Sequence, residues 1–180
     1  MENAAENICI PNKRLVGVCG LFCPSCSLFI GTQEDPERLK RIAEWWQVSL
    51  EAAQCYGCRS NKRFPYCETC KMSACALKRG IGFCGECEEY PCEDLKAFQP
   101  AMPHRIELWK SQERIKEVGY EKWYTEMIEH YSCPECRTLN SAYDLKCRNC
   151  GREPSCDYVN RHKQAIMQQL EQWSEKKEKR

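Results

Sequence analysis

The chain has 180 residues, enough for one or two small domains, and 17 of them are cysteine. Only 42% of the residues are hydrophobic, cysteines included, so a core held by apolar burial alone would be thin. The 27 basic and 26 acidic residues nearly cancel, which excludes the strongly basic footprint of a general nucleic-acid binder. Disulfides, metal ions or iron–sulfur clusters are therefore expected to cross-link the chain.

The cysteine pattern favours reduced thiols over disulfides. The count is odd and Cys-x-x-Cys pairs recur, which indicates metal binding rather than a secreted disulfide framework. One uncharged run, residues 15–33, follows Lys13 and Arg14 and looks like a signal peptide or a short membrane span. It contains three cysteines and Pro24, so we expect neither. We predict a cytoplasmic protein with no membrane partner.

The first cluster is the triplet Cys19-x3-Cys23-x2-Cys26. This spacing matches the cluster motif of radical S-adenosylmethionine enzymes, but 180 residues cannot supply their barrel, and Ser25 stands where they usually have an aromatic residue. Three interpretations remain. The triplet forms a zinc site completed by a distant cysteine (Cys9 or one of the central set), it holds an iron–sulfur cluster, or its thiols are reduced and structural.

The segments between the cysteine clusters predict helices. Asp35 and Pro36 are typical of an N-cap and a first turn, and Ser49 precedes a short helix over 50–54. Further helices are expected near 91–98, over 104–118 up to Gly119, over 120–131, and at 157–180 with a frayed end from 176. The expected buried residues are Leu39, Ile42, Ala43, Trp46, Leu95, Phe98, Ile106, Trp109, Ile115, Trp123, Met127, Tyr131, Val159, Ile166, Leu170 and Trp173. The predicted fold is mainly α, with small irregular β turns inside the metal-bound cysteine loops.

The central block holds eight cysteines in two sets. The first set is Cys55, Cys58, Cys67 and Cys70, and the second is Cys75, Cys84, Cys87 and Cys92. Each set can supply one four-thiolate site. The two sets can also interleave as in cross-braced zinc domains, with the 55/58 pair joined to 84/87 and the 67/70 pair joined to 75 and 92. The spacing predicts metal in this block and leaves the pairing open.

The segment CPECRTLNSAYDLKCRNCG resembles a zinc ribbon. Two Cys-x-x-Cys turns about ten residues apart can return on a hairpin and complete a tetrahedral thiolate site. Its predicted ligands are Cys133, Cys136, Cys147 and Cys150. Gly151 permits the left-handed backbone that the second turn needs, whereas Arg137 stands where such ribbons often have glycine. The roles of Cys9 and Cys156 are left open.

No catalytic constellation accompanies these thiols. The chain lacks a nucleophile elbow, a phosphate loop, an HExxH motif and a dinucleotide fingerprint, so we predict no catalytic residue and favour a non-enzyme. A catalytic zinc at the triplet would need a nearby acid or base, and none is visible. His104, His130 and His162 are isolated and expected at the surface. Basic residues around the ribbon could touch phosphate, but acidic neighbours offset them: Arg137, Lys146, Arg148 and Arg152 against Glu135, Asp144, Glu153 and Asp157.

The chain resembles a cysteine-rich family, domain of unknown function number 3795, over roughly residues 8–130. The residues that carry the resemblance are CGLFCPSC at 19–26, the Cys55-Tyr-Gly-Cys58 pair, the segment 66–95 and the surroundings of Gly119. The resemblance implies a small cysteine-rich, zinc-binding domain and no reaction. We therefore expect a metal-binding domain at 8–130, a zinc ribbon at 131–156 and an amphipathic helix with a charged tail at 157–180.

The functional prediction is a structural zinc protein with about three or four ions. It would serve as an interaction or adaptor module with a protein partner, and nucleic acid is the weaker alternative. The competing prediction is an iron–sulfur or thiol redox protein that uses Cys19, Cys23 and Cys26.

Overall fold

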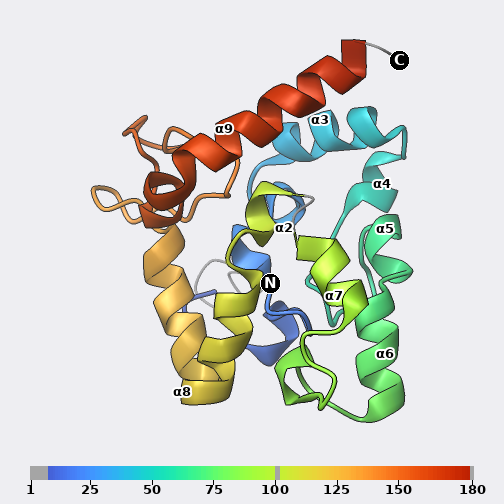
Figure 1. Ribbon diagram of the computed structural model, residues 1–180. Coiled ribbons are helices and arrows are strands. Elements are labelled where there is room, and N and C mark those ends of the chain that lie inside the picture. Colours follow the sequence, from blue (N-terminus) through green and yellow to red (C-terminus); the bar gives the residue numbers. More distant parts are fainter. Residues whose placement is uncertain (1–7, 100–101, 179–180) are drawn as a thin grey trace.

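The computed structural model describes residues 8–99 and 102–178 and shows a mainly helical protein (Figure 1). Its helices are α2 (Ser27–Gln33), α3 (Pro36–Trp46), α4 (Leu50–Ala53), α5 (Pro65–Glu68), α6 (Lys71–Arg79), α7 (Glu93–Phe98), α8 (Leu108–Tyr131) and α9 (Asp157–Glu178), joined by short 3-10 turns. Extended pairing in the described residues is limited to two isolated bridges, Val16 with Phe22 and Ser132 with Leu139. The predicted fold class is confirmed. No helix within the described ranges has the length and apolar character needed to cross a membrane.

The start of α3 follows its predicted cap. Asp35 Oδ1 accepts a hydrogen bond of 2.9 Å from the Arg38 amide, and Pro36 occupies the first turn. Leu39 and Ala43 are buried as expected, but Trp46 is 45% exposed. Its ring lies 5.3 Å from that of Phe64, so it packs at the rim of a small satellite core rather than inside it.

Three helices, α2, α5 and α6, lie where the sequence indicated no helix. The uncharged run continues into α2, and α6 carries Cys75 in the middle of the second central set. Gly80, with a φ of 67°, ends α6 in the left-handed conformation that glycine adopts without strain. At the other end of the chain, α9 continues to Glu178, beyond the expected onset of fraying at 176. Residues 179 and 180 lie outside the described part.

The two helices predicted on either side of Gly119 are confirmed as the two halves of α8. Gly119 has φ 80° and ψ 159°, which breaks the helix. Arg114 and Glu126 form a bidentate ion pair across this break, with N–O distances of 2.9 and 2.6 Å. A straight helix would separate them by about 18 Å at 1.5 Å per residue, so the halves fold back on each other. The first half begins later than predicted, because Pro103–Arg105 forms a 3-10 turn.

The main core is shared by segments from the whole chain. The Phe22 ring, in the triplet loop, lies 5.8 Å from Trp123, 5.0 Å from Tyr124 and 6.0 Å from Tyr131 on α8. Tyr131 stacks in turn on Tyr158 of α9 at 4.7 Å. Ala142 of the cysteine loop after α8 belongs to the same cluster. The three predicted domains therefore share one hydrophobic core.

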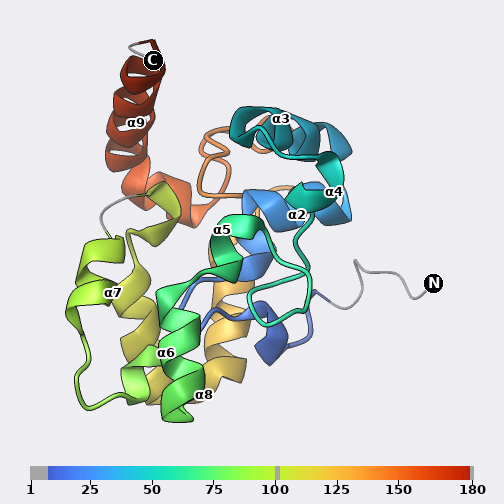
Figure 2. The same ribbon diagram turned by 90° about the vertical axis from the view of Figure 1, so that its right-hand side faces the viewer.

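Polar contacts fasten the loop 132–156 to the N-terminal helices. Both terminal nitrogens of Arg38 contact Asp144, at 3.1 and 2.9 Å, while its Nε contacts Asp35 at 3.0 Å. Ser27 on α2 shares a 2.8 Å hydrogen bond with Ser141, and Arg148 pairs with Glu34. In Figure 2 this loop, in orange, lies between α3 and α9.

We expect Asp144→Asn to lower the free energy of unfolding by about 3 kcal/mol, because it leaves the largely buried Arg38 guanidinium without one of its two carboxylates. Urea denaturation followed by circular dichroism measures the change. Glu51→Gln is the matched control, because its ion pair with Lys62 is exposed and should contribute no more than about 1 kcal/mol. Equal effects of the two variants would contradict this prediction.

Candidate metal centres

All 17 cysteines lie within the described residues, and each is a free thiol. The prediction of reduced cysteines is therefore confirmed for this structure. The fold gathers 15 of them into three places: the loop after α8, the interior between the N-terminal loop and α5, and a pocket beside α6 and α7. Cys9 is exposed, and Cys156 is buried in the main core.

The loop after α8 brings its four predicted ligands together. The four sulfurs all lie within 4.8 Å of one another, and they belong to Cys133, Cys136, Cys147 and Cys150. The Sγ–Sγ distance is 3.6 Å for Cys133–Cys150 and for Cys136–Cys147. A disulfide would need about 2.05 Å, whereas Zn–S bonds of about 2.3 Å in a tetrahedron place sulfurs about 3.8 Å apart. These four thiols therefore fit a tetrahedral metal ion.

Backbone geometry forms this four-cysteine site without a regular ribbon. Gly151 has a φ of 75°, as the sequence predicts, and Arg137 takes the same left-handed region with a φ of 62°. The Cys133 amide donates to the Thr138 carbonyl at 2.9 Å, and the Cys147 amide donates to the Arg152 carbonyl at 2.8 Å. Where a regular zinc ribbon has a hydrogen-bonded strand ladder, this loop has one isolated bridge, between Ser132 and Leu139.

Asn140 is a supporting residue that the sequence analysis missed. Its side chain is fully buried and donates to the Thr138 carbonyl at 2.9 Å, while its Oδ1 accepts from the Arg148 amide at 3.0 Å. Its Nδ2 also lies 3.7 Å from Cys147 Sγ. A buried amide hydrogen-bonded on both ends fixes the two cysteine turns relative to each other. The one sequence feature that could have indicated this supporting role is the position of Asn140 midway between the two Cys-x-x-Cys pairs.

The hydrogen bonds at Cys136 favour its thiolate. The hydroxyl and then the amide of Thr138 lower the pKa of the Cys136 thiol below its usual range. Thr138 Oγ1 lies 3.3 Å from Cys136 Sγ. A metal ion binds the thiolate, so these contacts reduce the work of displacing the proton.

The basic residues around the site are paired with acids. Arg137 pairs with Glu129, Arg152 with Glu135 and Arg148 with Glu34. Lys146 lies 3.6 Å from Glu153. Of the acids predicted to offset this charge, Glu135 and Glu153 do so, whereas Asp144 pairs with Arg38 and Asp157 with His130 and Arg161. Glu129 and Glu34 take their places, so the four basic side chains are each paired with an acid.

The N-terminal triplet meets the first central set in the interior. We call these residues the seven-thiol group: Cys19, Cys23, Cys26, Cys55, Cys58, Cys67 and Cys70. The Cys58 amide donates to Cys23 Sγ at 3.2 Å, which joins the two sequence clusters directly. Cys55 is near enough to raise the pKa of Cys26, and Cys58 is near enough to raise that of Cys19. The triplet therefore has its additional thiols in the central set, one of the alternatives that the sequence left open.

Cys19, Cys26 and Cys67 are protonated in the absence of a cation. Burial, followed by neighbouring thiols, raises the pKa of Cys26 and Cys67 to about 12, and burial raises that of Cys19 further. A cation must displace these protons, so metal affinity here falls as the pH falls. Backbone amides aimed at the sulfurs, such as those of Gly57 and Phe64 at Cys55, act in the opposite direction.

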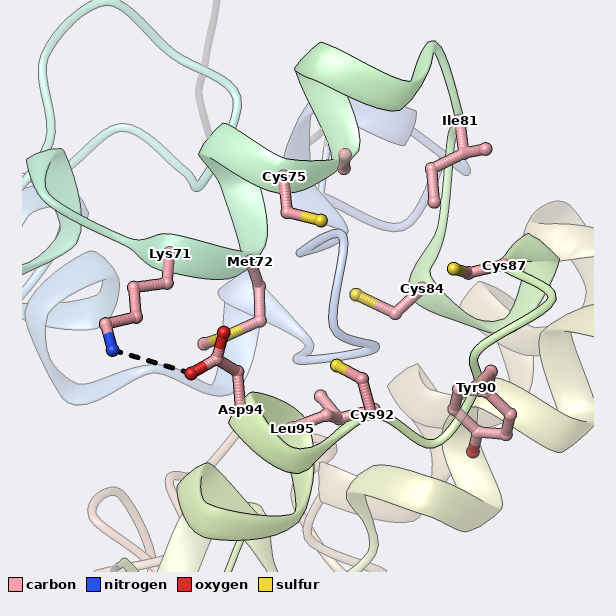
Figure 3. A pocket seen from close by; sticks show the side chains of 11 residues that line it. Lys71, Met72, Cys75, Ile81, Cys84, Cys87, Tyr90, Cys92, Asp94 and Leu95 are labelled. Atoms are coloured by element: carbon pink, nitrogen blue, oxygen red, sulfur yellow. Dashed lines mark hydrogen bonds and ion pairs between the residues drawn. The ribbon is translucent and has the colours of Figure 1, made fainter.

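The second central set lines a cavity of about 40 Å³ that we call the four-thiol pocket. It comprises Cys75 on α6, Cys84 and Cys87 on one tight turn, and Cys92 before α7. Figure 3 shows the sulfurs of Cys75, Cys84 and Cys92 directed toward a common space, with Cys87 beside them. The Lys71–Asp94 ion pair, at 3.4 Å, lies at one side of the pocket.

The pocket contains the second predicted set, but it also lies near cysteines of the other group. After burial, the thiols that raise the pKa of Cys84 are those of Cys92, Cys75, Cys70 and Cys87, in that order. Cys70 belongs to the first set, so the local pairing of ligands stays a prediction. Across the described residues, the group at 133–150 is the one place where three or more possible ligand atoms lie within 4.8 Å of one another. In the seven-thiol group and the pocket, no three sulfurs lie that close together.

The expectation of surface histidines is wrong. Glu107, at the start of α8, accepts from His130 Nε2 and from His162 Nε2, both at 2.8 Å. His130 Nδ1 lies 2.8 Å from Asp157, so its ring joins two carboxylates. His104 is buried with Nδ1 2.6 Å from the Tyr143 hydroxyl, and burial lowers its pKa to about 3. Helix periodicity could not reveal this cluster, because its members come from three separate segments.

Comparison with known families covers the first half of the chain. Residues 15–97 match a family described as "Protein of unknown function (DUF3795)". Residues 15–97 are therefore similar to this family, and we refer to this matched segment as the DUF3795 domain. The predicted resemblance is confirmed over a shorter range than 8–130, and the segment around Gly119 lies outside the match. The DUF3795 domain contains the seven-thiol group and the four-thiol pocket, whereas the site at 133–150 lies beyond it. No curated protein and no solved structure matches the chain significantly.

Proposed function

We propose that this protein is a structural zinc-binding protein that acts as an interaction module. The observation that carries the proposal is the convergence of four free thiols at 133–150 at spacings suited to a tetrahedral ion. We extend the same role to the DUF3795 domain, with the seven-thiol group and the four-thiol pocket as further zinc sites. Zinc has no redox chemistry of its own, so its part here is to hold the chain in shape.

The surface supports a protein partner over nucleic acid. The basic side chains around the site at 133–150 are paired with acids, as described above. In contrast, large apolar side chains are exposed on α3, α4 and α5, where Leu50 is 50% and Tyr66 51% exposed. The rings of Trp46 and Tyr66 lie 6.1 Å apart on this surface. Exposed apolar side chains that lie close together are typical of protein interaction sites.

The competing function is an iron–sulfur or thiol redox protein, and the seven-thiol group favours it. Seven thiols exceed the four that one structural zinc needs, and the Cys58 amide bonded to Cys23 Sγ is the kind of contact that tunes a cluster. In both cases the thiols must stay reduced, so we place the protein in a reducing compartment, the cytoplasm.

Metal analysis after anaerobic purification tests the proposal. We expect a colourless protein with about three or four zinc ions per chain. Cys136→Ser should lower the ion count by at least one, whereas Cys9→Ser, at an exposed thiol outside all three groups, should remove none. Iron with acid-labile sulfide would support the redox alternative instead. A folded protein without metal would overturn both.

A further inference from the structure

The buried side chain of Gln112, on α8, lies between the seven-thiol group and the four-thiol pocket. It is 1% exposed and hydrogen-bonds at both ends. Its Nε2 donates to the carbonyl of Val18, next to Cys19, at 3.0 Å. Its Oε1 accepts from the amide of Gly85, next to Cys84, at 2.6 Å. One side chain therefore contacts the first turn of both groups.

The two turns also contact each other directly. The Cys84 amide donates to the same Val18 carbonyl at 2.8 Å, so this oxygen accepts from the pocket turn and from Gln112. Displacing the pocket turn would leave buried polar atoms of the N-terminal loop without partners, which native structures avoid. The position of one turn thus depends on the position of the other.

The glycines of both turns make room for this side chain. A methyl group at Gly85 would approach Gln112 Oε1 to 2.9 Å, and one at Gly20 would approach Gln112 Nε2 to 2.9 Å. Each glycine directly follows the first cysteine of its turn, Cys84 and Cys19. Both turns are therefore packed on the same amide, with no space for a larger residue at either position.

We propose that Gln112 is a positioning residue that couples the two thiol groups, so that zinc binding in one raises the zinc affinity of the other. An ion in the pocket fixes the Cys84–Cys87 turn, which holds the Gly85 amide on Gln112. Gln112 and the Cys84 amide then fix Val18, and with it Cys19. Coupling between sites typically changes affinity about 5- to 150-fold. The inference rests on the proposed function, because it requires zinc in both groups.

The test is a zinc titration of the metal-free, reduced full-length protein, read by native mass spectrometry. Protection of cysteines from alkylation, followed by peptide mapping, assigns each ion to its group. For the wild type we expect few molecules with only one group loaded. Gln112→Met keeps the length of the side chain and removes both hydrogen bonds, so its partly loaded forms should accumulate while the final ion count is unchanged. Gln99→Met removes a comparable bond to the Ile106 carbonyl elsewhere and should load like the wild type.

A second comparison does not depend on the folding of the Gln112 variant. Cys75 is exposed, and Cys75→Ser weakens the pocket without touching the interior. It should lower the zinc affinity of the seven-thiol group at least about fivefold in a chelator competition, whereas Cys9→Ser, at an exposed thiol outside all three groups, should not. An unchanged affinity, or independent loading of the two groups in the wild type, overturns the coupling alone. Zinc bound only at 133–150 overturns the proposed function of the DUF3795 domain, and the coupling with it.

Discussion

Cys147→Ser should remove one metal ion and unfold most of the protein, not only its C-terminal third. Cys147 is 4% exposed, and the loop that carries it supplies Ala142 to the main core and Asp144 to Arg38. A structural zinc contributes about 10–16 kcal/mol of apparent binding free energy in finger peptides, against a domain stability of about 5–15 kcal/mol. The loss of this ion is therefore comparable to the whole stability of the fold.

Elemental analysis and the circular-dichroism signal of the helices measure the two parts of this prediction. Cys156→Ser is the matched control, because Cys156 is equally buried but lies outside all three thiol groups. It should keep the wild-type ion count and most of the helical signal. If Cys147→Ser lost its ion and still melted at the wild-type temperature, the ion would have no structural role.

Glu107→Gln should lower the free energy of unfolding by about 3 kcal/mol at neutral pH, because the carboxylate is largely buried between His130 and His162. His130 faces a carboxylate at each ring nitrogen, Asp157 at Nδ1 and Glu107 at Nε2. An amide at position 107 removes the negative charge between the two histidines and cannot accept a hydrogen bond at both of its ends. The contact between α8 and α9 should weaken accordingly.

The pH dependence follows from the same contacts. Although burial opposes it, hydrogen bonds from the two histidines lower the pKa of Glu107 from 4.5 to about 2. The folded pKa lies below the unfolded one, so the stabilisation is complete above about pH 4.5 and is lost as the pH falls toward 2. Urea denaturation of the wild type and Glu107→Gln at pH 7 and pH 3 should show a smaller difference at pH 3. Glu117→Gln, which breaks an exposed pair with Arg114, should change stability by no more than about 1 kcal/mol at either pH. A constant difference between the wild type and Glu107→Gln would contradict the argument.

Local patterns predicted the parts of this fold whose cause is local. The cap at Asp35, the break at Gly119 and the left-handed Gly151 are set by the residues that stand there, and all are confirmed. Cys-x-x-Cys spacing likewise predicted the four ligands at 133–150, because both turns and their connection are short. The short α6 was missed, because its cysteine and its flanking cysteines indicated a loop.

The sequence could not predict the contacts between distant segments of the chain. Glu107 meets His130 and His162 only after α8 folds back and α9 packs against it. Gln112 reaches Val18 across 94 positions of the chain. The triplet and the central cysteines also come together only when distant segments of the chain pack against each other. The spacing within either cluster does not indicate this contact.

The segment that matches the family model is shorter than the part of the chain that shares one aromatic core. The family match ends at residue 97, but Phe22 inside it is covered by Trp123, Tyr124 and Tyr131, and these by Tyr158. A recombinant fragment cut at the limits of the match would present this ring to water.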